Sequence, residues 1–128
     1  MSDLLNVLYI EDEEDIREMT EFALEDEGFN LVMCASGQEA LDKAPLLKPD
    51  FILLDMMMPG MDGMTTAIKL REMPHLENTP VIFMTAKVQK AEQQKYKDIG
   101  AIGVISKPFD AMKLADNIRE ILGISNEK

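Results

Sequence analysis

Hydrophobic residues in this chain gather in short runs, separated by longer stretches of mixed polarity. The runs are Leu4–Ile10, Phe29–Cys34, Phe51–Leu54, Val81–Met84 and Ala101–Ile105. The first, third and fourth contain at least four consecutive apolar residues without polar alternation. Strands of this kind are buried on both faces, as in parallel sheets covered by helices. The pattern therefore predicts five strands of a parallel sheet.

Helical signals lie between these runs. Ser36 and Glu39 have the spacing of a capping box, and Asp62–Gly63 indicates a turn that leads into a third helix. Asp110 is expected to cap the last helix. That helix has an apolar stripe at helical spacing, formed by Leu114, Ile118, Ile121 and Leu122. Strands and helices thus alternate, which predicts a (βα)5 fold: a doubly wound parallel α/β sheet with helices on both faces and right-handed crossovers.

The fourth helix, expected within Lys87–Asp98, is the weakest of these signals. Only Val88, Ala91 and Tyr96 are apolar in that stretch. Few core contacts mean low local stability, which fits either a loosely held surface helix or a movable element.

Length and charge narrow the possible functions. The 128 residues correspond to one domain, and no linker or repeat divides them. The net charge is −11, and residues 1–27 hold 11 acidic residues against one basic residue. Phosphate backbones repel such a chain, so no direct nucleic-acid binding is expected. No apolar stretch is long enough for a membrane span, and the first apolar run lacks the basic flank and the cleavage site of a signal peptide. The single Cys34 suits a reducing compartment. We therefore expect a cytoplasmic protein.

Polar residues follow four of the five apolar runs directly. Glu11 and Asp12 follow the first run, Asp55 follows the third and Thr85 follows the fourth. The fifth strand is expected to end near Lys107. Parallel connectivity brings strand carboxyl ends to one edge of the sheet, where sites form in α/β proteins. Two carboxylates ~5 Å apart repel each other by roughly 3 kcal/mol, and a hard divalent cation relieves this repulsion. Oxygen ligands favour Mg²⁺, and the lack of a His/Cys set argues against zinc.

This donor set predicts metal-assisted phosphoryl transfer. A carboxylate can act as the nucleophile and become an aspartyl phosphate, and Asp55 is the best candidate because it ends the central buried strand. Lys107 and Mg²⁺ would neutralise charge on the phosphoryl oxygens, and the Thr85 hydroxyl would donate to one of them. Glu11 and Asp12 would hold the metal.

Four segments carry a resemblance to a known family. They are Tyr9–Glu13, Leu53–Gly63, Phe83–Ala86 and Ser106–Phe109. In this order and at these strand ends, they resemble the receiver domain of two-component response regulators. The resemblance covers about residues 4 to 123 and implies one receiver domain over 1–128 without an effector domain. It also implies the flavodoxin-like strand order 2-1-3-4-5.

The resemblance implies a role for each matching residue. Asp55 would be the phosphoacceptor, Thr85 the switch hydroxyl and Lys107 the contact to the phosphoryl group. The resemblance also implies that Mg²⁺ is held by Glu11, Asp12, Asp55 and the main-chain carbonyl of Met57. It also implies a cis bond between Lys107 and Pro108. Val104 stands where the family often has an aromatic residue that rotates inward on activation, and valine offers no such ring.

The implied function is a phosphorylation-dependent signalling switch. A sensor histidine kinase or a histidine phosphotransfer protein would supply the phosphoryl group. Phosphorylation would then change the surface of the fourth helix, fifth strand and fifth helix, which binds a downstream protein, with the chain as a monomer or a phosphorylation-dependent dimer. The chain would catalyse its own phosphorylation and dephosphorylation and would not be a turnover enzyme.

Two other functions stay open at this point. One is a Mg²⁺-dependent aspartyl-phosphate phosphatase, although such enzymes usually carry an acid two residues after the nucleophile, where this chain has Met57. The other is a docking module that is never phosphorylated, which the complete set of acids, hydroxyl and lysine disfavours.

Overall fold

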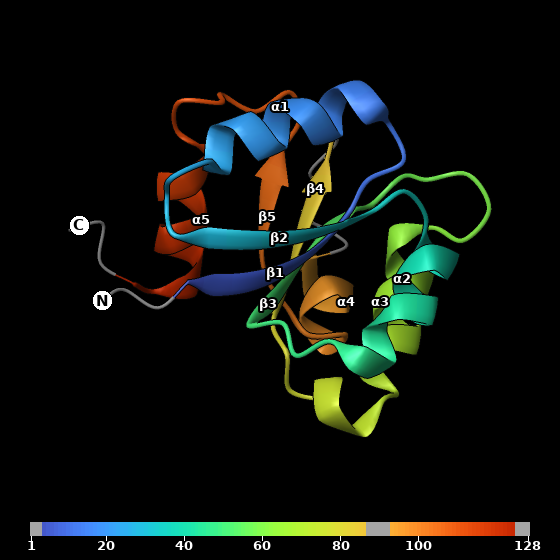
Figure 1. The fold of residues 1–128 in the computed structure, drawn as a ribbon. Coiled ribbons are helices and arrows are strands. Elements are labelled where there is room, and N and C mark those ends of the chain that lie inside the picture. The colour runs from blue at the N-terminus through green and yellow to red at the C-terminus, as the bar shows by residue number, and fades with distance from the viewer. Residues whose placement is uncertain (1–3, 87–92, 125–128) are drawn as a thin grey trace.

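A computed structural model describes residues 4–86 and 93–124, and it forms a five-stranded sheet between two layers of helices (Figure 1). The strands are β1 (Leu5–Ile10), β2 (Phe29–Cys34), β3 (Phe51–Asp55), β4 (Val81–Thr85) and β5 (Ala101–Ser106). All neighbouring strands are parallel, in the order β2-β1-β3-β4-β5. The predicted fold class and strand order are confirmed, and β3 and β4 end at Asp55 and Thr85, as expected.

The helices lie on both faces of the sheet, as the crossover rule requires. They are α1 (Glu14–Leu24), α2 (Gly37–Lys43), α3 (Gly63–Arg71), α4 (Gln93–Asp98) and α5 (Leu114–Leu122), with short 3-10 helices η1 (Ala44–Leu46) and η2 (Pro74–Leu76). Figure 1 shows α1 and α5 together on one side of the sheet and α2 and α3 on the other. Within residues 4–86 and 93–124, every helix is too short or too polar to cross a bilayer.

The core consists of two apolar layers, one on each face of the sheet. Alternate residues of the central strands feed them: Leu8, Ile52 and Phe83 face the α2–α4 layer, whereas Tyr9 and Leu53 face the α1–α5 layer. Strands β3 and β4 are buried along their whole length. The unbroken apolar runs of the sequence follow from this burial on both faces.

Capping interactions fix the starts of two helices near the carboxyl edge of the sheet. The Ser36 hydroxyl accepts the Glu39 N–H at 3.0 Å, and Glu39 in return accepts the Ala35 N–H at 2.9 Å. The Asp62 carboxylate accepts the Thr65 N–H at 2.8 Å and so caps α3. These bonds satisfy N–H groups that have no partner within the helix.

The prediction for the last helix needs one correction. Asp110 does not cap α5, because its carboxylate accepts the N–H of Met112 in a preceding turn and α5 begins only after Lys113. The apolar stripe is confirmed: Leu114 and Ile118 are fully buried on the sheet, with Ile121 and Leu122 packed beside them. Gly123 ends the helix in the left-handed conformation (φ 75°) that favours glycine.

Helix α4 has a small buried face, as its sequence predicts. Among residues 94–98, whose burial the structure describes, Tyr96 is the buried one, and it packs on Phe83 of β4 with ring centroids 5.5 Å apart. The first part of the expected helix, residues 87–92, lies outside the described residues. Val104 of β5 is half-buried and packs against the same layer.

Candidate functional site

Polar residues from four segments converge at the carboxyl edge of the sheet. Glu11 and Asp12 follow β1, Asp55 ends β3, and one carboxylate oxygen from each of the three lies within 4.8 Å of the others. Thr85, at the end of β4, is buried, and its carbonyl accepts the Lys107 N–H at 2.9 Å. The structure thus brings together the predicted acids and the lysine, with the main chain of Thr85 bonded to that of Lys107.

Asp55 is held by strand pairing of its main chain and by a hydrogen bond to its side chain. It pairs with Met84 in the β3–β4 ladder, and its side chain is 3% exposed. Its Oδ1 accepts the Met57 N–H at 3.2 Å. This bond fixes the direction of the carboxylate, with the second oxygen left for other partners.

Lys107 lies between two of the acids. Its Nζ is 3.2 Å from Asp55 Oδ1 and 2.9 Å from Glu11 Oε1, although the latter contact lacks hydrogen-bond alignment. Burial lowers the pKa of Lys107, but the neighbouring Glu11 and Asp55 carboxylates outweigh it and leave the pKa above its usual range. The lysine is therefore a fixed positive charge in this site.

Glu11 is fully buried, and its surroundings disfavour the charged form of its carboxyl group. Desolvation, together with the nearby Asp55 carboxylate, raises its pKa to about 7, although the Lys107 ammonium acts in the opposite direction. Its main-chain carbonyl accepts a hydrogen bond from Arg17 Nη1 at 2.7 Å. That bond ties the first turns of α1 to the end of β1 and holds the acidic pair in place.

The donor set fits a hard divalent cation. Among the described residues, Glu11 Oε1 and Asp12 Oδ1 are the buried side-chain polar atoms without a hydrogen-bond partner. Three carboxylates face one ammonium, so the cluster has unbalanced negative charge. Clustered carboxylate oxygens with free lone pairs are the ligands that Mg²⁺ prefers.

Gly63 and Arg17 help to fix the geometry of the site, and the sequence analysis did not predict their roles. A Cβ on Gly63 would lie 2.4 Å from the Asp55 carbonyl oxygen, so only glycine lets α3 begin against the end of β3. Gly63 also donates its N–H to the Met56 carbonyl at 3.0 Å. The Asp62–Gly63 pair signalled a turn, but nothing in the sequence showed this close approach, nor the reach of Arg17 to Glu11.

Two further predictions concern the Lys107–Pro108 peptide bond and the main-chain carbonyl of Met57. The Lys107–Pro108 peptide bond is cis, as the resemblance implies. Met57 points its N–H at Asp55 and exposes 74% of its side chain, while the metal contact expected of its carbonyl stays a prediction.

This fold and site define a class of protein: a parallel α/β domain with an acidic triad, a hydroxyl and a lysine at the carboxyl edge of its sheet. The model of the response regulator receiver domain matches residues 7–119. The chain therefore belongs to the receiver domain family of two-component response regulators.

Individual relatives agree with this assignment. The chain is 36% identical over 95% of its length to the transcriptional regulatory protein CseB of Streptomyces coelicolor, and 32% identical over 91% to the alkaline phosphatase synthesis transcriptional regulatory protein PhoP of Bacillus subtilis. It spans 51% and 48% of those proteins, about half their length. The chemotaxis protein CheY4 of Vibrio cholerae shares the fold with a TM-score of 0.86 and 30% identity, over 92% of this chain and 98% of that one.

Proposed function

We propose that this receiver domain is a phosphorylation-dependent switch with Asp55 as its phosphoacceptor. The observation that carries the proposal is the charge imbalance at the carboxyl edge: three clustered carboxylates share one lysine, and the buried Asp12 Oδ1 has no hydrogen-bond partner. An imbalance of this kind is unfavourable for folding alone. It suits a site that takes up a cation and then a phosphoryl group.

The chain's own residues have distinct parts in the proposed reaction. An Asp55 carboxylate oxygen attacks the phosphorus of a phosphohistidine; the new O–P bond forms while the N–P bond breaks and its electron pair returns to the imidazole. Lys107, already 3.2 Å from Asp55, stabilises the charge on the transferred group, and the Thr85 hydroxyl donates to one of its oxygens. Glu11, Asp12, Asp55 and the Met57 carbonyl would hold Mg²⁺, which supplies further neutralisation of phosphoryl charge.

Family membership supports our proposal for the phosphoryl donor and for the output. A sensor histidine kinase or a histidine phosphotransfer protein supplies the phosphoryl group. Phosphorylation shifts the surface of α4, β5 and α5 between two states, and a downstream protein reads that surface. Helix α4 is short, and few buried contacts are what a movable element requires, which supports its part in this change.

The proposed domain organisation is one receiver domain over 1–128, which functions in the cytoplasm. The two named regulators act in transcription as whole proteins, and this chain matches only about half of each. The expected lack of nucleic-acid binding concerns the acidic surface of this domain, whose net charge is −11.

Incubation with acetyl phosphate and Mg²⁺ tests the proposal. Intact-mass measurement should show one added phosphoryl group, and Asp55→Asn should abolish it because an amide oxygen is a poor nucleophile. Asp50→Asn is the matched control, since Asp50 is an exposed aspartate outside the site. Equal labelling of the Asp55→Asn variant would contradict the proposal. Many turnovers of a simple phosphoester would instead support a phosphatase.

A further inference from the structure

Among the described strands, β2 is an edge strand of the sheet, and no strand pairs with its outer side. It ends the sheet and pairs only with β1. The carbonyl of Gly28 accepts the N–H of Leu5 in β1 at 2.9 Å, and that of Cys34 accepts the N–H of Glu11, just after β1, at 3.0 Å. Main-chain groups alternate in direction along a strand, so those of Leu31 and Met33 point to the open side.

The sequence of β2 does not protect this edge. Strands at sheet edges commonly carry lysine, proline or a bulge that prevents another strand from pairing. Phe29–Cys34 contains neither lysine nor proline, and its register with β1 is regular over all six residues. Figure 1 shows β2 at the front of the molecule, with α1 above it and the α2 side below. The edge is thus available for strand addition.

A hollow on the α1 side of β2 is acidic. It measures about 520 Å³ and reaches from the end of α1 to Phe29, Asn30 and Leu31. Its carboxylates, all exposed, are Glu18, Glu21, Glu25 and Asp26. The ring of Phe22 also lines it and is 70% exposed. Carboxylates beside an aromatic face make a favourable site for a guanidinium group, which pairs with the former and stacks on the latter.

A second hollow, on the opposite face of β2, is apolar. It measures about 310 Å³ and lies between β2, β1 and the segment after η1. Its apolar lining includes Val7, Leu8, Val32, Leu46 and Leu47. Leu46 is 92% exposed at its rim. Lys48 also lines it, so this hollow lacks the negative charge of the first.

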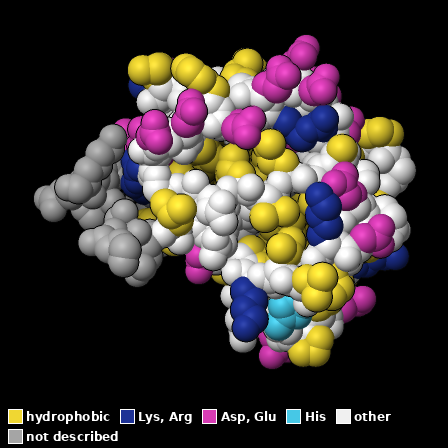
Figure 2. Space-filling model, viewed as in Figure 1, with side chains coloured by type: hydrophobic (Ala, Val, Ile, Leu, Met, Phe, Trp, Pro, Cys, Tyr) yellow, Lys and Arg dark blue, Asp and Glu magenta, His cyan; other side chains and the backbone are white. Residues whose placement is uncertain are grey.

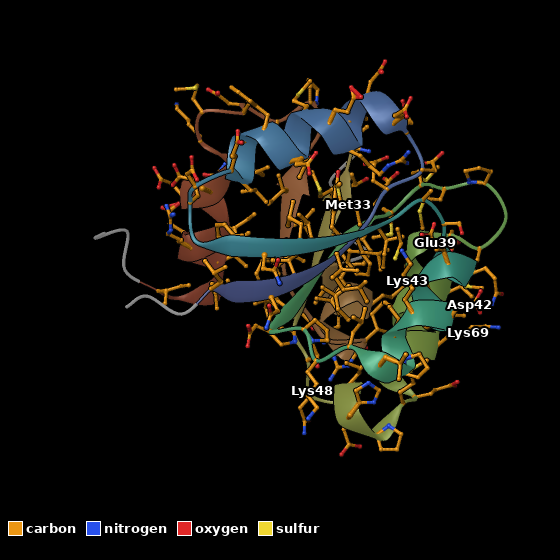
Figure 3. The ribbon with its side chains drawn as sticks, viewed as in Figure 1. Met33, Glu39, Asp42, Lys43, Lys48 and Lys69 are labelled. Carbon is orange, nitrogen blue, oxygen red and sulfur yellow. The ribbon has the colours of Figure 1, made fainter. Side chains whose placement is uncertain are left out.

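The figures agree with this arrangement. Figure 2 shows hydrophobic side chains over the middle of this face and acidic ones above them, over α1. In Figure 3, Met33 extends from β2 toward α1, while Lys48 lies below the strand. Both hollows share Asn30 in their linings, so they flank the same stretch of strand.

We propose that the open edge of β2 binds an extended partner segment in which arginine or lysine alternates with aliphatic residues. Side chains of an added strand point alternately to the two faces of the sheet. The basic ones would enter the acidic hollow and the aliphatic ones the apolar hollow, while the backbone pairs with Leu31 and Met33. A second copy of the chain is a poor occupant, because its β2 has no basic residue to enter the acidic hollow. Two chains that each carry a net charge of −11 also repel each other.

A short capped peptide that alternates arginine with valine tests the proposal. It should bind the whole protein and shift the amide NMR signals of Leu31 and Met33. Binding should weaken as ionic strength rises, because exposed charges are screened. A peptide of the same composition with its arginines and valines in separate blocks should bind much more weakly. Equal binding of the two peptides, or shifts confined to α4, β5 and α5, would overturn the proposal.

Two surface variants sharpen this test without touching the core. Glu21→Lys with Glu25→Lys should raise the Kd for the alternating peptide by about tenfold or more, because both changes place like charge against the arginines. Glu72→Lys with Glu77→Lys makes the same change in net charge away from β2 and should leave binding nearly unchanged. Equal weakening by both pairs would reduce the effect to net charge and overturn the assigned site.

Leu46→Asp addresses the apolar hollow separately. This exposed position can take a charge without loss of folding, and peptide binding should fall while acetyl phosphate still labels Asp55. Unchanged peptide binding would overturn the role of that hollow. Sedimentation at the NMR concentration checks the competing occupant: a dimer that Leu46→Asp dissociates would show that a second copy, rather than a basic partner, takes the edge.

Discussion

Two charged clusters join the early and late parts of this chain, and they differ in balance. At the site, Lys107 faces the carboxylates of Glu11, Asp12 and Asp55. Toward the opposite ends of the strands, Arg119 of α5 reaches the Glu27 carbonyl at 2.7 Å and its carboxylate at 2.9 Å. It also bonds Asp116 at 2.9 Å and lies 5.7 Å from the Phe29 ring centre.

The difference separates a structural cluster from a ligand site. The Arg119 guanidinium is shared between two acids and a carbonyl, and no orphaned polar atom is found around it in the described chain. The Lys107 cluster leaves Glu11 Oε1 and Asp12 Oδ1 without hydrogen bonds. A balanced cluster stabilises the fold by itself, whereas an unbalanced one gains its full stability only with a ligand.

Loss of the balanced cluster should have the largest effect on folding. Arg119→Met should lower the free energy of unfolding by about 2–3 kcal/mol, because it leaves Glu27 and its carbonyl without their charged donor. Urea unfolding measures this loss. Asp116→Asn is the control and should cost less than about 0.5 kcal/mol, since that carboxylate is 58% exposed. An equal loss in both variants would mean that the guanidinium is not central.

Added Mg²⁺ should stabilise the wild-type protein through the unbalanced cluster alone. At a hundredfold excess over its Kd, the gain is about 2.7 kcal/mol, and thermal unfolding with and without chelator measures it. Arg119→Met should keep this gain in full. Asp12→Ala should lose it, and a Mg²⁺ response retained by Asp12→Ala would place the metal elsewhere.

Removal of one charge from the site should stabilise the metal-free protein. Asp12→Asn relieves repulsion among three clustered carboxylates, so we expect the free energy of unfolding to rise by about 1 kcal/mol in chelator. Phosphorylation by acetyl phosphate should fall sharply in the same variant. A less stable Asp12→Asn protein would show that this carboxylate supports the fold.

The free energy of unfolding of the metal-free protein should depend on pH through Glu11. Its pKa is raised in the folded protein to about 7 from 4.5, so the folded state binds the proton more tightly. The stability from this proton is complete below pH 4.5 and is lost as the pH rises through about 7. Metal-free wild-type protein should therefore lose stability across this window, with a slope of at most about 1.4 kcal/mol per pH unit. Glu11→Gln should flatten the slope, and an unchanged slope would assign it to another group.

The sequence predicted the strands well because their apolar runs are unbroken, and it placed the site because parallel strands end at one edge. Asp55, Thr85 and Lys107 needed only this rule. The Arg119 cluster escaped prediction, since its partner Glu27 is 92 positions away and lies outside any motif. Asp110 was misplaced because a local Asx turn competed with the helix cap.

The contact between Gly63 and the Asp55 carbonyl has a consequence for how a signal can leave the site. Because α3 starts in van der Waals contact with the main chain of β3, the acceptor strand and this helix form one stiff unit. A rearrangement at Asp55 could move α3 relative to β3 only if the main-chain contacts of Gly63 were broken. For the proposed switch, we therefore expect the change to pass from β3 through the neighbouring β4 toward α4 and β5.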